Sequence, residues 1–308
     1  MSDTKTPLRR IGAGFCGTVW AAGHHGPAFK REDGGPDRSL LNDYNMHQHL
    51  QDHKSSMTQI QIPICYKFLT PSSEWWHGNL DRFPRGYQPC SMIHAQRIPP
   101  ISENARRLIA ERYCPPQLIS EIMDSDTNRD CLIRPYLGRR RRHTTQRASR
   151  FQAFSLRNYP LHVDQMEELG IPERDITGYA RSMAEALAVM HWGAEVDGND
   201  VEFVLAAPND INTREPQTQW SNILGRHSMW ILDFDLVRTM DMDEQGVQQA
   251  VKAFWKNDPF FPRPDGSNMW KAFREQYLQT SKKCIENRTV AGYGDLHGLP
   301  DLFIDSLG

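Results

Sequence analysis

The pattern of apolar and polar positions predicts a strand-rich first half and a helix-rich second half of the chain. Residues 8–22 predict a strand, a glycine turn and a second strand, and residues 27–30 begin a third. Residues 39–50 carry apolar side chains near helical spacing. In residues 175–191 the apolar positions recur every three or four residues, which is typical of an amphipathic helix. The fold class expected from this pattern is α+β.

Shorter apolar runs complete the outline. Further strands are expected at 58–68, 132–137, 201–205 and 229–236, and further helices at 245–255 and 269–285. Pro63 interrupts the first of these strands, which favours an edge position. Residues 70–102 are rich in Pro, Gly and polar aromatic side chains, so they are expected to form an extended loop or insertion.

Composition excludes several classes of protein. The chain has 308 residues, 36 basic and 38 acidic, and is 39% hydrophobic, so it is neither histone-like nor disordered. It has no apolar run of roughly 18 residues, so no membrane helix is expected. The polar first ten residues lack the apolar segment of a secretory signal. The six cysteines show no CxxC spacing, which predicts reduced thiols, a cytoplasmic location and no metal site.

The charges are strongly segregated. Residues 131–163 contain no Asp or Glu but eight arginines, which are Arg134, Arg139, Arg140, Arg141, Arg142, Arg147, Arg150 and Arg157. Guanidinium groups bind phosphate through paired hydrogen bonds, so this stretch predicts contact with a nucleic acid. Residues 191–243 reverse the balance, with ten carboxylates and three arginines. Such a cluster binds cations, either metal ions or guanidinium groups. The alternative for both stretches is an ordinary solvated face.

A glycine motif opens the first half. Gly12, Gly14 and Gly17 form a GxGxxGxV pattern that continues as strand, which is the hairpin form of a protein-kinase glycine loop. Lys30 follows in Ala-Phe-Lys, similar to the lysine strand of kinases. Asp43 lies on the next predicted helix, where kinases place the acidic partner of that lysine.

The second half contains two further matches. Asp233 begins an Asp-Phe-Asp sequence at a strand end, in the position of the kinase DFG motif. Asp197 and Glu202 have the five-residue spacing of the catalytic Asp and metal-binding Asn. The order of the four motifs predicts a divergent protein-kinase-like bilobal fold. Its strand-rich N-lobe spans 8–137, with an insertion around 70–130, and its mainly helical C-lobe spans 138–308 and begins with the Arg-rich loop.

The departures from a kinase argue against nucleotide binding. His191 lies four residues too early for the HRD motif, and Glu202 replaces the metal-binding Asn. Pro135 lies where a kinase hinge donates a backbone N–H to adenine, and proline has none. No cofactor is therefore expected.

Several longer strings resemble a fungal family known as a domain of unknown function, DUF3669, over roughly residues 8–280. They are LIRPYLGRRR, FSLRNYPLHVDQM, AEALAVMHWGAEVDGNDVEFVL, WILDFDLVR and NDPFFPRP. Some members are similar to fungal arginine-containing cyclodipeptide synthases, which close amino acids from charged tRNAs into a cyclic dipeptide. The resemblance implies an aminoacyl-tRNA-dependent acyltransferase that joins arginine from arginyl-tRNA to a second aminoacyl residue. Its partners are the two charged tRNAs, without a membrane or a protein partner.

This chemistry suggests a role for each charged group. The carboxylates of Asp197, Glu202 and Asp233 are the expected catalytic residues, as base and as guanidinium ligands. Substrate contacts are expected from Glu195, His191, Lys30 and the three glycines. Phosphate contacts are expected from Arg139, Arg140, Arg141, Arg142, Arg147 and Arg150.

Other readings remain open from the residues alone. The retained Lys30 and Asp233 also fit a divergent kinase-fold phosphotransferase that uses ATP, and the lost motifs fit a pseudokinase that only binds. The pair of Lys30 and Asp43 is equally consistent with a structural salt bridge. Cys16, in the glycine turn, is either a nucleophile or an inert thiol.

Overall fold

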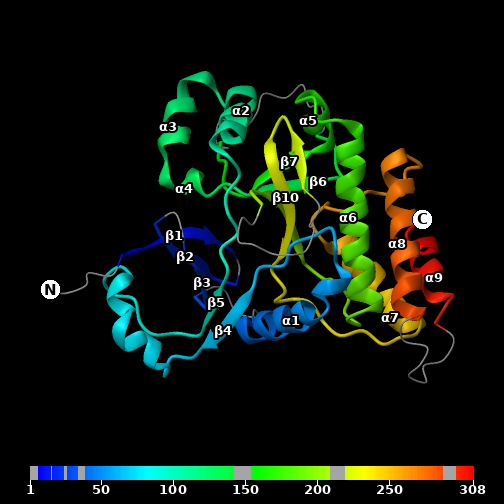
Figure 1. Cartoon of the computed structure of the whole chain (residues 1–308), viewed down its shortest axis with the longest axis horizontal. Helices are drawn as coiled ribbons and strands as arrows, with labels where there is room; N and C mark the ends of the chain where they lie inside the picture. Colours follow the sequence, from blue (N-terminus) through cyan, green and yellow to red (C-terminus); the bar gives the residue numbers. More distant parts are fainter. Residues whose placement is uncertain are drawn as a thin grey trace.

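The computed structural model describes residues 6–14, 16–23, 26–33, 39–141, 154–208, 219–286 and 296–308. It has the α+β class expected from the sequence, with two five-stranded sheets and helices around them (Figure 1). None of the described helices combines the length and the hydropathy that a membrane span needs.

The first sheet is antiparallel, in the order β1-β2-β3-β5-β4. Its strands are β1 (Leu8–Ala13), β2 (Thr18–Ala22), β3 (Ala28–Arg31), β4 (Cys65–Leu69) and β5 (Met92–Ala95). The turn between β1 and β2 requires glycine, because Gly17 has a φ of 147° and a Cβ there would lie 1.8 Å from the Arg31 carbonyl oxygen. Helix α1 (Leu40–Asp52) begins at an N-cap, Ser39, and packs against β4 and β5.

The second sheet has the order β7-β6-β8-β10-β9. Its strands are β6 (Ile133–Tyr136), β7 (Tyr159–His162), β8 (Glu202–Ala206), β9 (Trp220–Asn222) and β10 (Gly225–Leu232). Strands β8 and β10 are antiparallel, and Leu232 pairs with Glu202. Asp233 follows Leu232 directly, so the sheet register brings Asp233 and Glu202 to the same edge.

The insertion between β4 and β6 is more ordered than the sequence indicates. It contains three short 3-10 helices, Glu74–Gly78, Leu80–Arg82 and Pro116–Leu118, together with β5, α2 (Glu103–Tyr113), α3 (Ile119–Asp124) and α4 (Asp126–Arg129). The expectation of a loop over 70–102 is wrong at β5, which lies inside the first sheet between β3 and β4. The aromatic residues of this segment pack on Trp20 and around the Arg31 guanidinium.

Most of the remaining helices lie on the side of the second sheet that faces away from the first sheet (Figure 1). The remaining helices are α5 (Val163–Glu168), α6 (Glu173–Trp192), α7 (Glu244–Lys256), α8 (Asn268–Glu286) and α9 (Leu299–Asp305). Figure 1 shows α6 between the second sheet and α8, and α6 packs extensively on α8. A continuous core of aliphatic and aromatic side chains joins the second sheet to these helices.

Candidate functional site

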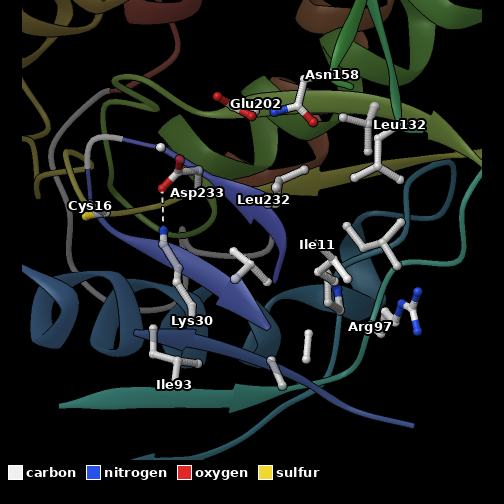
Figure 2. A pocket seen from close by; sticks show the side chains of 18 of the residues that line it. Ile11, Cys16, Lys30, Ile93, Arg97, Leu132, Asn158, Glu202, Leu232 and Asp233 are labelled. Atoms are coloured by element: carbon white, nitrogen blue, oxygen red, sulfur yellow. Dashed lines mark hydrogen bonds and ion pairs between the residues drawn. The ribbon is translucent and has the colours of Figure 1, made fainter. Parts of the chain in front are cut away.

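A cleft of about 200 Å³ lies between the two sheets. The β1–β2 turn forms its glycine-rich rim, and β6, β8 and β10 form one of its walls, which is uppermost in Figure 2. Apolar side chains line its middle, among them Ile11, Val19, Ala28, Ile93, Leu132, Val204 and Leu232. Charged side chains lie on either side of this apolar region, which is the usual composition of a small-molecule site.

Lys30 on β3 joins two carboxylates at one side of the cleft. Its Nζ lies 2.6 Å from Asp43 Oδ2 and 2.7 Å from Asp233 Oδ1, the second contact being visible in Figure 2. Burial by itself lowers the pKa of Lys30, but the two carboxylates outweigh burial and hold that pKa well above its ordinary value. Asp43 also accepts a hydrogen bond from the backbone N–H of Phe234, at 3.0 Å. Lys30 is therefore a charged group that anchors α1 and the end of β10.

Asp233 adopts a backbone conformation that is costly for a residue with a side chain. Its φ is 66°, in the left-handed region that Asp tolerates better than most residues. Burial raises the pKa of its carboxyl, and the Lys30 ammonium opposes that rise. Such conformations persist where the surroundings hold them, and they are frequent at functional sites.

Glu202, at the start of β8, faces the cleft beside Asp233 (Figure 2). Its carboxylate accepts a hydrogen bond from the Arg134 guanidinium on β6. Burial raises the pKa of Glu202 to about 7; Arg134 opposes the rise and the Asp233 charge adds to it. A carboxylate with a pKa near 7 is suited to accept a proton at neutral pH.

Asp197 does not join this pair, contrary to the expected carboxylate cluster. It is buried, and its Oδ1 accepts hydrogen bonds at 3.0 Å from the backbone N–H groups of Asn199 and Arg238. Its Oδ2 accepts another from Gln249 Nε2, at 2.9 Å. Asp197 does not line the cleft, and its bonds hold the loop after α6 against α7. These bonds give Asp197 a structural role in this loop, and its expected catalytic role stays a prediction.

Glu195 and His191 also lie away from the cleft lining. The backbone carbonyl of Glu195 accepts from Met240 N–H, and its φ of 55° marks a tight turn after α6. The His191 side chain is fully buried, its Nδ1 is 2.8 Å from the Tyr277 hydroxyl, and burial lowers its pKa to about 3. His191 thus packs in the α6–α8 interface, and its expected substrate contact stays a prediction.

The glycine turn lies where the sequence predicts it, because Gly12, Gly14 and Gly17 all line the cleft. Cys16 lies beside them, and its Sγ donates to Asp235 Oδ2 at 3.0 Å. Burial raises the pKa of this thiol far above its ordinary value, with a smaller contribution from Asp235. The nucleophile is the thiolate, so this environment supports the inert alternative for Cys16.

The Arg-rich stretch is only partly within the described residues. Arg140 forms two hydrogen bonds of 2.6 Å with Glu167, and Arg141 contacts Asp164 and Glu168 at 2.6 and 2.8 Å. Arg139 is exposed. Arg142, Arg147 and Arg150 lie outside the described residues. The carboxylates of α5 thus neutralise two of the arginines that were expected to contact phosphate.

Two parts of the site were not expected from the sequence. One is the contact of Arg134 with Glu202, and the other is a buried charge cluster in which Asp130 accepts from both Arg9 and Arg97. Asp130 and Arg97 line the cleft. Arg134 was expected only as part of the Arg-rich stretch, and its place within a short apolar strand is the one sequence signal for a buried contact. Within the described part of the chain, no group of three or more His, Cys, Asp or Glu side chains could hold a metal ion.

Comparison with known proteins gives one partial match. The profile of the family DUF3669, described as a zinc finger protein, matches residues 229–289, about a fifth of the chain. The matched segment includes Asp233, α7 and α8. It contains one cysteine, Cys284, and no histidine, so it lacks the four Cys or His ligands of a zinc finger. No curated protein matches the chain.

Proposed function

We propose that the protein is a tRNA-dependent arginine-containing cyclodipeptide synthase whose reaction takes place in the cleft between the two sheets. The observation that carries the proposal is the pair of neighbouring carboxylates, Glu202 and Asp233, at one edge of the cleft, each in contact with a cation. Carboxylates in a largely apolar cleft suit a cationic substrate, and guanidinium matches their geometry. The partial match to DUF3669 agrees with the resemblance found in the sequence.

The same proposal includes a divergent kinase-like frame, with an N-lobe over 8–137 and a C-lobe over 138–308. It is supported by the five-stranded antiparallel sheet with its glycine turn and by the ion pair that joins β3 to α1. The location of Asp233 directly after β10 also agrees with it. A cytoplasmic location, where charged tRNA is available, belongs to this proposal.

In the proposed reaction Glu202 pairs with the arginyl guanidinium, and Asp233 accepts a proton from the α-ammonium of one aminoacyl residue. The free amine attacks the ester carbonyl of the other residue and an amide bond forms. The amine nitrogen gives a second proton to the terminal oxygen of the first tRNA, which leaves as the alcohol, and the carboxylate releases its proton to solvent. The α-ammonium of the resulting dipeptidyl ester is deprotonated in the same way, and its amine attacks the remaining ester, which closes the ring and releases the second tRNA as the alcohol. Two ester bonds break and two amide bonds form. The esters are already activated, so ATP is not needed by the enzyme.

A second candidate function is phosphotransfer from ATP, or nucleotide binding without catalysis. It is favoured by the contacts of Lys30 with Asp43 and Asp233, which match the lysine, helix carboxylate and DFG aspartate of a kinase. It is disfavoured by β6, where Pro135 has no N–H and Arg134 extends toward Glu202 in the cleft.

The test is product formation from purified components. Arginyl-tRNA and a second charged tRNA should yield a cyclic dipeptide containing arginine, detected by mass spectrometry. The product should vanish after ribonuclease treatment and form without ATP. A strong thermal stabilisation by ATP and Mg²⁺, with no product from correctly charged tRNAs, would transfer the assignment to the second candidate.

Contact with tRNA should show in the dependence of binding on salt. Replacing Arg139, Arg142, Arg147 and Arg150 by Gln should lower the salt slope of tRNA affinity by about one for each lost phosphate contact. The matched control is Gln at Arg140 and Arg141, which already pair with carboxylates and should change the slope less. The measurement is a series of tRNA titrations at increasing salt, and equal slopes for all proteins would contradict a phosphate contact.

A further inference from the structure

Arg134 occupies the carboxylate that the proposed substrate needs. Its Nη2 donates to Glu202 Oε1, and both side chains are largely buried, with 18% and 21% of their surface exposed. Both residues line the cleft. A ligand guanidinium that takes both oxygens of the Glu202 carboxylate must therefore displace a guanidinium of the protein itself.

The hold of Arg134 on Glu202 uses one terminal nitrogen. The other, Nη1, is 3.5 Å from Asp258 Oδ2, and Nε has no hydrogen-bond partner among the described residues. A guanidinium and a carboxylate bind most strongly through two parallel N–H donors. A ligand that presents such a fork to Glu202 has a geometric advantage over the one-nitrogen contact of Arg134.

Asp258 offers the Arg134 guanidinium a second carboxylate acceptor. The Asp258 carboxylate is 49% exposed, and the Tyr136 hydroxyl donates to its Oδ2 at 2.7 Å. This hydrogen bond fixes the carboxylate beside Nη1. Moving the Arg134 guanidinium to Asp258 keeps its charge paired, so displacement avoids the cost of leaving a buried cation alone.

We infer that Arg134 is a specificity-determining residue, which holds Glu202 in the free protein and moves to Asp258 when a ligand guanidinium replaces it. The identity of that ligand as the arginyl side chain rests on the proposed function. A lysine side chain offers a compact ammonium without the planar fork, so it competes less well for Glu202. The exchange lowers apparent affinity, since only the fraction of molecules with Glu202 released can bind.

Calorimetric titration of the full chain with L-argininamide tests this exchange without tRNA. Arg134→Met should bind L-argininamide at least about tenfold more tightly than wild type, because the competing charged hydrogen bond is gone. Its preference for L-argininamide over L-lysinamide should fall. Because Arg134 lowers the pKa of Glu202, its removal raises that pKa, so the titrations are made in a series of increasingly alkaline buffers. Arg107→Met, an exposed arginine on α2 paired with Glu103, is the matched control and should bind as wild type does.

Substitution of Asp258 distinguishes the proposed exchange from a purely structural role of Arg134. Asp258→Asn should weaken L-argininamide binding in the wild-type background and have little effect in the Arg134→Met background, since no displaced guanidinium then needs an acceptor. If Arg134→Met does not fold, Arg134→Lys replaces it, and tighter binding than wild type is again expected.

Unchanged or weaker binding by the folded Arg134 variants, no binding by any of the proteins, or additive effects of the two substitutions would overturn the inference. Product formation from charged tRNAs decides the proposed function separately. An active wild-type enzyme with unaltered argininamide affinity in the variants would retain the function and refute the exchange. An inactive protein that shows the exchange would refute the function alone.

Discussion

Replacing Glu202 by Gln is expected to lower the rate of cyclic dipeptide formation by about a hundredfold or more, because the charged partner of the arginyl guanidinium is lost. Gln keeps an oxygen that can accept from Arg134, so the β6–β8 contact survives while the negative charge is lost. The measurement is the rate of product formation from charged tRNAs, with folding checked by circular dichroism. Glu103→Gln, on the exposed face of α2, is the matched control and should keep the wild-type rate.

The pH dependence of the wild-type rate checks the same assignment. Burial raises the pKa of Glu202 to about 7, so the carboxylate that pairs with the guanidinium is present above that pH and protonated below it. The rate should therefore rise through about pH 7 and level off. In Glu202→Gln the residual rate should lose this step. A step that persists in the variant would assign this titration to another group.

Replacing Lys30 by Met is expected to lower the free energy of unfolding by about 3–5 kcal/mol, as measured by urea denaturation. The ammonium is the cation shared by Asp43 and Asp233, and its removal leaves the buried Asp43 carboxylate and its neighbour without a counter-charge. The control is Lys282→Met, which removes an exposed pair with Glu286 and should cost less than about 0.5 kcal/mol.

The sign of the pH effect follows from Asp233. Burial raises the pKa of its carboxyl, and removing Lys30 raises it further. The folded variant therefore binds protons more readily than the unfolded chain. The difference in unfolding free energy between wild type and variant should be smaller at mildly acidic pH and larger at mildly alkaline pH. Lys30→Met/Asp233→Asn should recover part of the lost stability. A double variant as unstable as the sum of the single variants would show that the two groups do not interact.

Local periodicity was a reliable guide to the long elements and a poor one to the short ones. The helices expected at 175–191, 245–255 and 269–285 are confirmed within a few residues by α6, α7 and α8. The strand expected at 58–68 is confirmed only in its last residues, by β4. Strand β5 was missed because its four residues are ordered by their neighbours β3 and β4 rather than by a local pattern.

Helix α2 was not predicted, although its signals are present in the sequence. Ser102 is an N-cap residue whose side chain accepts from the backbone N–H of Ala105. The apolar positions Ala105, Leu108 and Ile109 then recur at helical spacing. The polar composition of the surrounding segment obscured this pattern.

The sequence by itself determined the α+β class, the glycine turn and the order of the charged motifs, because these depend on residue type and spacing along the chain. Only the tertiary structure decided which carboxylates meet. Asp197 and Glu202 are five residues apart, but the chain turns between them at Gly198 and Asp200, with φ of 61° and 63°. Asp197 therefore bonds to Gln249 on α7, while Glu202 pairs across β8 and β10 beside Asp233. Spacing along a chain does not fix the direction of a side chain through such a turn, whereas the register of a sheet does.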